Sequence, residues 1–595
     1  MEIEQIKLNG DERLIDALKS KGYTDIPSNV ILDKTLTGIG ATYAELHSCR
    51  NSIIIEPNVP VIVGKTAKNG DWLAVYSNTT VVQIKKYLKR TDVKYKKILT
   101  TPEGFKKVRK AADKSYSLIQ ETYFCLFDEC EKLTQDCDYR VSILQPVYDF
   151  FDFKEKAFVS ATPLEVSHPA FEGQGFKKLE IVPQYDYRKD LHLIVTSSYE
   201  RTVREEFQRL KDSSCVCIFL NSVTGINELV NSLHLEGESR IFCSEEGVGK
   251  LKDAGFTNAV SSIDYPLAKY NFFTSRFYSA VDIELNVKPD ILILTNLNNA
   301  VYTTVDPYTD AIQIVGRFRN GVSSITYISN TKKGLPQRSK EEIKGYLICS
   351  KEIYRTMKNF YDCATDRASR DAYRAALESL PFNRMLDRNG RENWFAIDNY
   401  MDEELMKNYF YDENSLYKAY DNCDSFIVYH AGYYCPLGDS ERLKRENKSQ
   451  SIKDKRKEIV RQLEMLGDCV TEMELEYKRD LIAADSFIVE AYDTVGKEVI
   501  EKLKYSKKKI TEAMIQKQYS EKATGTEVIR LIKNSFTVGQ KYTRKYTKEE
   551  IKRIYALLNI YPPKAITSKT ICDFFMVSEC KIKGERCYLL IEEIL

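Results

Sequence analysis

Two adjacent carboxylates end an apolar run of strand length. Asp128 and Glu129 directly follow Phe-Cys-Leu-Phe at residues 124–127. Ligands bind at the carboxyl edge of open α/β sheets, so a pair placed there can act on a bound molecule. Enzymes of phosphoryl transfer use one such carboxylate to hold Mg²⁺ and another to orient or deprotonate the attacking water. We assign these roles to Asp128 and Glu129; an ordinary strand end is the alternative.

A glycine-containing loop follows another apolar run, Val-Ile-Leu at residues 30–32. Gly38 and Gly40 precede a helical segment beginning near Tyr43, an order that lets backbone N–H groups surround a phosphate while Thr42 binds Mg²⁺. A tight strand-to-helix turn is the alternative. The predicted nucleotide-binding residues of the loop are Lys34, Thr37, Gly38, Ile39, Gly40, Ala41 and Thr42.

Position 41 is alanine, where phosphate loops of this kind carry lysine. Two explanations remain open. Lys34 reaches over the loop and supplies the missing charge, or the site is degenerate and the protein survives as a nucleic-acid-binding scaffold. The intact pair Asp128 and Glu129 favours the first, because a decayed site has no use for them.

A third cluster, Gln313 to Gly321, contains Arg317 and Arg319. Arginines that reach across a cleft can neutralise charge that develops on a γ-phosphate. The alternative is a solvated basic turn. We count Gln313 and both arginines among the catalytic candidates and favour Arg317 as the one that faces the phosphate.

Runs of strand length alternate with helical segments over the first 330 residues and restart after a Pro/Tyr-rich stretch near residues 182–190. This pattern predicts an α/β protein with two tandem parallel-sheet domains, residues 1–182 and 183–335. A helical accessory domain is predicted for residues 336–540. Residues 541–595 read as helix, helix and β-hairpin, the order of a winged helix, with Gly584 near the hairpin tip.

Eight short segments, in order, resemble the motifs of superfamily 2 (DEAD/DEAH-like) helicases, and the resemblance covers roughly residues 25–330. The segments are 35–42 (motif I), 53–57 (Ia), 100–103 (Ib), 128–131 (II), 160–163 (III), 219–222 (IV), 274–283 (V) and 313–319 (VI). The resemblance implies RecA-like domains that bind ATP and Mg²⁺ between them. Departures from the family pattern are the alanine at position 41 and a second motif VI arginine that comes one residue early.

Carried over residue by residue, the resemblance also implies a nucleic-acid track and a motif V contact to the nucleotide through Asp282. Ser160 and Thr162 would couple the nucleotide site to the strand-binding face. The implied nucleic-acid-binding residues are Pro57, Thr101, Pro102, Asn221, Ser222 and Thr274.

The net charge is only +2, so a nucleic-acid partner depends on local basic stretches. Residues 441–462 hold nine Lys/Arg against four Asp/Glu, and residues 532–553 hold seven against two, with Tyr542 and Tyr546 interleaved. Lys507–Lys509 adds a further basic cluster, and Lys581, Lys583 and Arg586 would lie on the wing. Solvated helix faces are the alternative for each stretch. Such stretches suit phosphate tracking and base stacking.

Fifteen cysteines without a C-x-x-C pair, five scattered histidines and no apolar stretch of membrane-spanning length favour a cytoplasmic protein with reduced thiols and no membrane contact. We therefore predict an ATP-dependent helicase or translocase in replication or recombination, with replication proteins as partners. Single-stranded or forked DNA is favoured over RNA, and the Lys-, Tyr- and Asn-rich composition is typical of a phage or mobile element. The other functions left open are an ATPase-deficient scaffold and the motor subunit of a nuclease or restriction complex.

Overall fold

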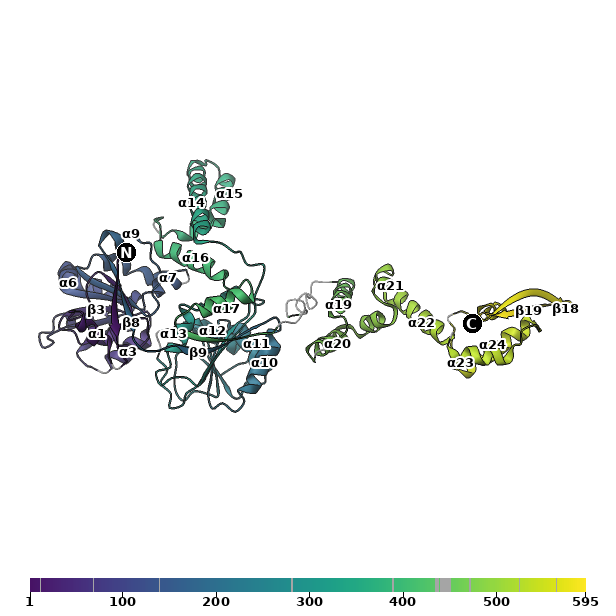
Figure 1. The fold of residues 1–595 in the computed structure, drawn as a ribbon. Helices are drawn as coiled ribbons and strands as arrows, with labels where there is room; N and C mark the ends of the chain where they lie inside the picture. Colours follow the sequence, from purple (N-terminus) through teal and green to yellow (C-terminus); the bar gives the residue numbers. More distant parts are fainter. Residues whose placement is uncertain are drawn as a thin grey trace. The chain divides into compact units, whose positions relative to one another are not determined.

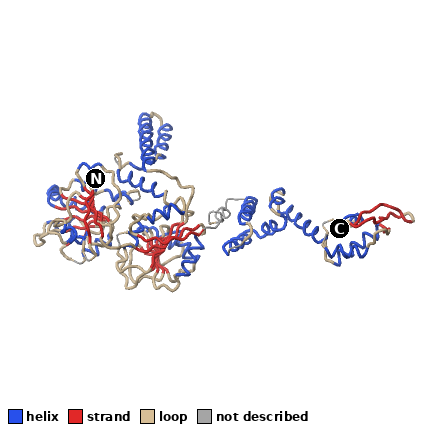
Figure 2. The backbone as a smooth tube through the Cα atoms, in the orientation of Figure 1, coloured by secondary structure: helices blue, strands red, loops and turns tan. Residues whose placement is uncertain are grey.

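A computed structural model describes residues 1–595 except 11, 68, 139, 280, 281, 388, 389, 434–437, 439–450, 470, 471, 524, 563 and 595. The chain divides into two compact units, Met1–Tyr434 and Cys435–Leu595, each described by itself below. Figure 1 labels the elements along the chain, and Figure 2 separates helices from strands. No helix among the described residues combines the length and the apolar character needed to cross a bilayer.

The first sheet has eight parallel strands in the order β1-β8-β2-β7-β6-β3-β5-β4. Its strands are β1 (Ile3–Leu8), β8 (Lys177–Pro183), β2 (Val30–Asp33), β7 (Glu155–Ser160), β6 (Tyr123–Asp128), β3 (Asn51–Ile55), β5 (Lys97–Thr100) and β4 (Trp72–Val75). All six residues of β6 are buried. Ile53 and Ile55 belong to one core cluster and Ile54 to the other, because successive side chains of a strand point to opposite faces. Continuous apolar runs therefore form the central strands.

Short helices connect the strands of the first sheet. They are α1 (Leu14–Ser20), α2 (Ala41–Leu46), α3 (Val59–Thr66), α4 (Val81–Leu88), α5 (Pro102–Ala112), α6 (Tyr116–Thr122), α7 (Lys132–Gln135), α8 (Val147–Phe151) and α9 (Pro169–Gly173), with 3₁₀ turns η1 (Asp113–Ser115) and η2 (Val141–Leu144). Lys97 stabilises the C-terminal end of helix α2: its Nζ donates to Glu45 O at 2.6 Å and to Ser48 Oγ at 2.8 Å. This buried network fixes the helix that follows the glycine loop.

The second sheet also has eight parallel strands, in the order β12-β11-β13-β10-β14-β15-β9-β16. They are β12 (Ala259–Val260), β11 (Ser239–Phe242), β13 (Tyr270–Phe273), β10 (Val216–Phe219), β14 (Asp290–Thr295), β15 (Ser324–Ser329), β9 (Lys189–Thr196) and β16 (Phe426–Tyr433). Its helices are α10 (Tyr199–Arg209), α11 (Val223–Ser232), α12 (Glu245–Asp253) and α13 (Asp310–Gly316), with turns η3 (Ser275–Phe277) and η4 (Val301–Thr303). Both sheets thus confirm the predicted α/β class with two parallel-sheet domains.

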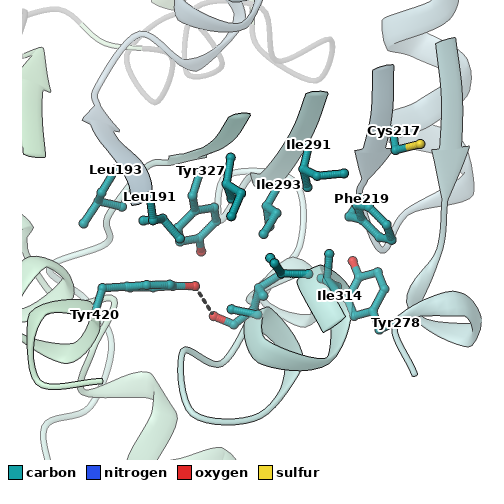
Figure 3. Close-up of a cluster of buried hydrophobic side chains, with 14 of the residues drawn as sticks. Leu191, Leu193, Cys217, Phe219, Tyr278, Ile291, Ile293, Ile314, Tyr327 and Tyr420 are labelled. Carbon is teal, nitrogen blue, oxygen red and sulfur yellow. Dashed lines mark hydrogen bonds between the residues drawn. The ribbon is translucent and has the colours of Figure 1, made fainter. Parts of the chain in front are cut away.

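Helix α13 packs on one face of the second sheet, together with the segment around Tyr420. Ile314 of α13 packs under Ile291, Ile293 and Tyr327 in a continuous apolar cluster (Figure 3). Tyr420 lies in the same cluster, and its hydroxyl donates to Val305 O at 3.1 Å. Because α13 is anchored by buried apolar side chains, its polar residues face away from the core in a fixed position.

The interval 336–540, which we expected to be one helical domain, contains more than helices. It begins with α14 (Lys340–Cys363), α15 (Arg367–Ser379), η5 (Pro381–Met385), α16 (Trp394–Lys407) and α17 (Glu413–Asp421). Strand β16 then returns to the second sheet and pairs with β9 from Phe426↔Lys189 to Tyr433↔Thr196. The first 335 residues therefore do not complete the second sheet, because its edge strand comes from about 90 residues later in the chain.

The second unit is mainly helical and ends in a small sheet. Its elements are α19 (Ile452–Leu466), α20 (Glu472–Val495), α21 (Lys497–Lys502), α22 (Lys507–Ala523), α23 (Thr526–Ser535), β17 (Lys541–Thr543), α24 (Arg544–Leu557), η6 (Ser568–Asp573), β18 (Phe575–Ile582) and β19 (Glu585–Glu593). The antiparallel order is β17-β19-β18, and the hairpin turns at Lys583-Gly584, both with positive φ. Residues 567–579, expected to be a second helix, form a 3₁₀ turn and the start of a strand instead, because aromatic and β-branched residues there complete the hairpin.

Candidate functional site

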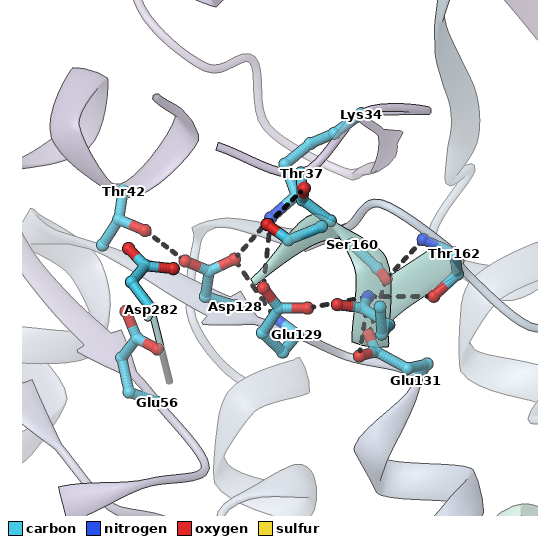
Figure 4. Close-up of polar contacts among 12 residues, drawn as sticks. Lys34, Thr37, Thr42, Glu56, Asp128, Glu129, Glu131, Ser160, Thr162 and Asp282 are labelled. Atoms are coloured by element: carbon cyan, nitrogen blue, oxygen red, sulfur yellow. Dashed lines mark hydrogen bonds and ion pairs between the residues drawn. The ribbon is translucent and has the colours of Figure 1, made fainter. Parts of the chain in front are cut away.

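The carboxylates that the sequence singled out lie at the carboxyl end of β6, in the middle of the first sheet. Asp128 is 2% exposed and Glu129 is 8% exposed. Glu129 adopts φ +50°, a left-handed backbone that costs a non-glycine residue energy and clusters at functional sites. This conformation turns the chain sharply after β6, and both carboxylates reach one polar cluster (Figure 4).

The glycine loop joins β2 to α2, as the sequence predicted. Gly38 and Gly40 have φ of +77° and +95°, so the loop uses the left-handed region where glycine is favoured. Thr35 also has φ +57°, and its Oγ1 donates to Ile181 O at 2.6 Å, which ties the loop to β8. Ala41 begins helix α2 and is buried. No cation therefore stands at the position where a lysine was expected.

Lys34 places a cation beside the two carboxylates. Its Nζ lies 3.4 Å from Asp128 Oδ1 and 3.5 Å from Glu129 Oε1, and its side chain is almost entirely buried. Burial by itself disfavours the ammonium form, but the neighbouring carboxylates outweigh this cost and raise the pKa of Lys34 above its usual value. The lysine is charged and lies against the same two carboxylates that the loop faces.

Thr42 and Asp128 bring two oxygen ligands to one point. The Thr42 hydroxyl donates to Asp128 Oδ2, so both groups converge at the N-terminus of α2. Mg²⁺ in nucleotide sites is held by one or two such protein oxygens together with phosphate oxygens. The pair fits that role, and no group of three or more His, Cys, Asp or Glu among the described residues forms a separate metal cage.

Glu129 and Glu131 form a buried acidic pair with opposite behaviour. Although burial opposes ionisation, the charges of Lys34 and Arg317 hold the pKa of Glu129 below its usual value. Burial and the negative charge of Glu129 raise the pKa of Glu131, which also accepts a hydrogen bond from Ser160 Oγ at 2.6 Å. Glu129 is thus the ionised partner and Glu131 the one that retains a proton more readily.

Helix α13 of the second sheet completes this cluster. Gln313 donates from Nε2 to Glu129 Oε2 at 3.3 Å and to Thr162 Oγ1 at 3.0 Å. Arg317 is 2% exposed, and its guanidinium donates to the side-chain and backbone oxygens of Gln313. The two sheets therefore share one hydrogen-bonded network, and Thr162 joins it from the end of β7.

Arg319 lies against the glycine loop. A methyl group added at Gly38 would stand 2.0 Å from its Nη1, so the guanidinium would have to move away from the loop. Its Nη2 also lies 2.6 Å from Asp282 Oδ1. Asp282 is thereby drawn to the loop, whereas its predicted neighbours Ala280 and Val281 lie outside the described residues. Of the two arginines, Arg319 contacts the loop and Arg317 supports Gln313.

A cavity of about 480 Å³ adjoins the loop residues 35–39. Tyr185 and Tyr187 of the segment between the sheets form part of its lining, opposite the apolar side chains of Val315 and Phe318. Sequence reasoning missed these tyrosines as site residues. Two aromatic residues can stack on a base, but nothing in the sequence indicates that this segment lies beside the glycine loop.

Four of the six predicted nucleic-acid residues line a second cavity of about 790 Å³ between the sheets: Pro57, Asn221, Ser222 and Thr274. Thr101 and Pro102 do not line it. Thr101 caps α5 instead, with its Oγ1 accepting from Gly104 N at 3.0 Å, and both residues are buried. The cavity also includes Arg140 and Arg276, which sequence reasoning did not single out.

No family model and no curated protein matches this chain. Among solved structures it is similar to Dbp5 of S. cerevisiae bound to RNA and ADP BeF3, at 15% identity and TM-score 0.33, over 64% of this chain and 90% of that chain. It is also similar to the Mycobacterium smegmatis helicase Lhr bound to ssDNA and AMP-PNP, at 12% identity and TM-score 0.33, over 57% of this chain and 47% of that one. The helicase domain of Hef from Pyrococcus furiosus matches at 12% identity and TM-score 0.31, over 52% of this chain and 93% of that one.

The architecture follows from the strand orders and from the position of the polar cluster. Both sheets are parallel, and the polar cluster combines groups from strand ends of the first sheet with groups from a helix of the second. The chain has two tandem RecA-like parallel sheets followed by a mainly helical C-terminal region.

Proposed function

We propose that this protein is an ATP-dependent nucleic-acid helicase or translocase. The observation that carries the proposal is the single buried network that joins Lys34, Glu129 and Gln313 across the two sheets. A nucleotide bound at the loop would touch groups from both sheets at once. Its hydrolysis can therefore change the distance between them, which is the movement that a motor requires.

Residues of the loop and residues at the end of β6 have different roles in binding and hydrolysing the triphosphate. The N–H groups of residues 38–42 surround the phosphates, and Lys34 places its charge on the other side of the loop. Thr42 and Asp128 would hold Mg²⁺, which would neutralise part of the phosphate charge. Glu129, ionised and hydrogen-bonded to Gln313, orients the attacking water and accepts its proton.

Arg319 is the arginine that we now assign to the phosphates, because it already lies against Gly38. Arg317, which the sequence favoured for this role, is a positioning residue for Gln313 in this proposal. The base of the nucleotide occupies the cavity beside the loop, where Tyr185 and Tyr187 stack on it.

A nucleic-acid strand occupies the cavity between the sheets that Pro57, Asn221 and Thr274 line. Hydroxyl, amide and guanidinium groups there suit contacts to a sugar-phosphate backbone without reading bases. We propose DNA as the substrate, in replication or recombination. This choice rests on the hairpin-bearing C-terminal unit and on the Asp-Glu-Cys-Glu form of motif II.

The test is ATP turnover of the full chain alone and with single-stranded DNA, forked duplex DNA or single-stranded RNA. We expect slow turnover alone and stimulation by single-stranded and forked DNA. Stimulation by RNA alone would refute the choice of DNA and leave the motor standing. No turnover under any condition would refute the motor and favour the scaffold, in which the Lys34 ion pairs close the site permanently.

A further inference from the structure

Helices α14, α15 and α16, within residues 340–407, form a helical insertion. This insertion and the domain of the first sheet enclose a cavity of about 590 Å³ that the proposed mechanism does not use. One wall comes from α8 and the end of η2, and the other from α14, η5 and the start of α16. Figure 1 shows α14 and α15 as a hairpin that projects from the body of this unit, above α16. The volume is in the range of pockets that bind small molecules or single nucleotides.

The base of this cavity is rigid. His168 stacks on Phe151 at a centroid distance of 4.9 Å and on Phe395 at 5.9 Å, so the ring joins the first sheet to α16. Burial lowers the pKa of His168, which keeps the ring neutral. Ser167 N also donates to Asp398 Oδ2 at 2.9 Å. The insertion is therefore fixed on the first sheet, and the cavity between them is a permanent feature.

Aromatic rings line the cavity. Tyr148 is 53% exposed, and Tyr354 and Trp394 are partly exposed. The Arg391 guanidinium lies 5.4 Å from the Tyr148 ring centroid. Stacking on such rings is the sequence-tolerant way in which proteins hold unpaired bases.

Cations surround these rings. Arg355, Lys358 and Arg391 line the cavity against one acidic lining residue, Glu392. Side-chain exposures of 67%, 42% and 64% leave the three cations accessible from solvent. Each makes an ion pair with a neighbouring carboxylate, but exposed pairs of this kind are weak, so a phosphate can compete for the cations. The combination of rings and solvent-accessible cations suits a single-stranded nucleic acid.

One segment of the chain borders both this cavity and the cavity between the sheets. Arg140 lines the cavity between the sheets and donates to Pro57 O at 2.8 Å, while Leu144 and Tyr148, a few residues further along the same segment, line the insertion cavity. Ser142, between them, donates to Glu103 Oε1 at 2.8 Å, which fastens the segment to α5. A strand that leaves the cavity between the sheets along this segment would reach the insertion cavity.

We propose that the cavity between the helical insertion and the first sheet holds an unpaired nucleotide of the strand beyond the inter-sheet track. Its base stacks on Tyr148 and Trp394, and its phosphates meet Arg355 and Arg391. The inference rests on the proposed function to the extent that a strand lies in the inter-sheet cavity. It gives the insertion a role in retaining one separated strand.

The first test is equilibrium binding of the full chain, by fluorescence anisotropy, to labelled single-stranded DNA of about 6 and about 20 nucleotides at several salt concentrations. Arg355→Ala and Arg391→Ala are each expected to lower the slope of log K against log salt by about one for the longer strand only, because one phosphate contact is lost. Arg367→Ala is the matched control, because this arginine lies on the same hairpin, is 96% exposed and does not line the cavity.

The second test uses tryptophan fluorescence. The chain has two tryptophans, Trp72 and Trp394, so Trp72→Phe leaves Trp394 as the only reporter. Saturable quenching by the longer strand, absent with the shorter one, is expected if a base stacks on Trp394. Unchanged fluorescence with a strand that anisotropy shows to be bound would overturn the proposal.

The two tests separate this inference from the proposed function. The insertion site alone is overturned if both strand lengths bind and the salt slope of Arg355→Ala equals that of Arg367→Ala. Failure of the wild-type chain to bind either strand, with or without a non-hydrolysable nucleotide, overturns both.

Discussion

The two parallel sheets of the first unit have the same number of strands but contribute opposite chemistry to the shared site. The first supplies the carboxylates Asp128 and Glu129, delivered by a strand end, together with one buried lysine. The second supplies Gln313 and Arg319, delivered by a helix and the turn after it. Negative groups and the glycine loop are thus on one side, and an amide and guanidinium groups on the other.

This division means that neither sheet contains a complete site. The hydrogen bond from Gln313 to Glu129 and the contact of Arg319 with Gly38 exist only while the sheets are together. Under the proposed function, chemistry at the nucleotide therefore depends on the separation of the sheets. Substitutions on either side therefore test how far the other side depends on them.

The largest effect is expected from Lys34→Met. Removing the cation should lower kcat/KM for ATP by about 100-fold or more, as loss of a preorganised electrostatic partner does. The double variant Lys34→Met with Ala41→Lys, which returns a lysine to the usual loop position, is expected to recover part of the activity. Steady-state ATP turnover measures both, and thermal melting verifies folding. Unchanged turnover in the single variant would remove Lys34 from the site.

Glu129→Gln should lower kcat about 100-fold while nucleotide affinity is retained, because an amide cannot accept the proton of the attacking water. Glu131→Gln is the matched control. Its pKa is raised by burial and by Glu129, so a neutral amide replaces it at little cost. Single-turnover hydrolysis and nucleotide titration separate the two quantities. Equal losses in both variants would contradict the assignment of Glu129 as the ionised partner.

On the second sheet, Arg319→Ala and Arg317→Ala are expected to fail in different ways. Arg319→Ala should weaken nucleotide affinity by about tenfold with unchanged melting, because it loses a charge-assisted contact at a partly exposed position. Arg317→Ala should lower both kcat and the melting temperature, since Arg317 is buried and supports Gln313. The reverse pattern would return the phosphate-facing role to Arg317.

Gly316→Ala tests the closest approach of the two sheets. An added methyl group would stand 2.2 Å from Thr37 Oγ1, whose hydroxyl donates to Gly316 O at 3.1 Å. Turnover should fall several-fold because the glycine loop can no longer approach α13, and Thr37→Gly in the same chain should restore it by making room. Failure of the second change to rescue would show that the contact does not matter for closure.

The smallest effect concerns Asp402 of α16, whose pKa is raised by burial and then by the charges of Asp310 and Glu403. A raised carboxyl pKa leaves stability intact below the unfolded value near 4 and costs stability as pH rises above it. Asp402→Asn should therefore leave the free energy of unfolding unchanged near pH 4 and increase it by about 1–3 kcal/mol at higher pH. Denaturant unfolding at several pH values checks this, with the exposed Asp212→Asn as control.

The sequence was informative wherever function depends on short segments that fold locally. Asp128 and Glu129 had to lie at a strand end because the four residues before them are apolar and suit a buried parallel strand. The two glycines between β2 and α2 had to form a loop, since their positive φ is costly for other residues. The hairpin at Gly584 was predicted for the same reason.

Sequence reasoning failed where spatial neighbours are far apart in the chain. Nothing near Phe426 indicates that β16 pairs with β9, because parallel pairing depends on tertiary packing. The one-residue shift in the arginine segment also concealed that Arg319 lies on the loop, since the turn after α13 determines where each side chain points. Thr101 caps α5, a role that calls for the same small hydroxyl as a phosphate contact, so its contact with nucleic acid stays a prediction.

The sequence by itself determined the two α/β repeats, the strand-end carboxylates and the glycine loop, because hydrophobic periodicity and glycine placement are local properties. Only the tertiary structure decided which groups Lys34 meets, since its Nζ contacts Asp128 and Glu129 across 94 and 95 residues of chain. It also decided that the linker tyrosines adjoin the loop and that the helical insertion encloses an aromatic, basic cavity. Such contacts arise from packing of whole elements, which short sequence segments do not specify.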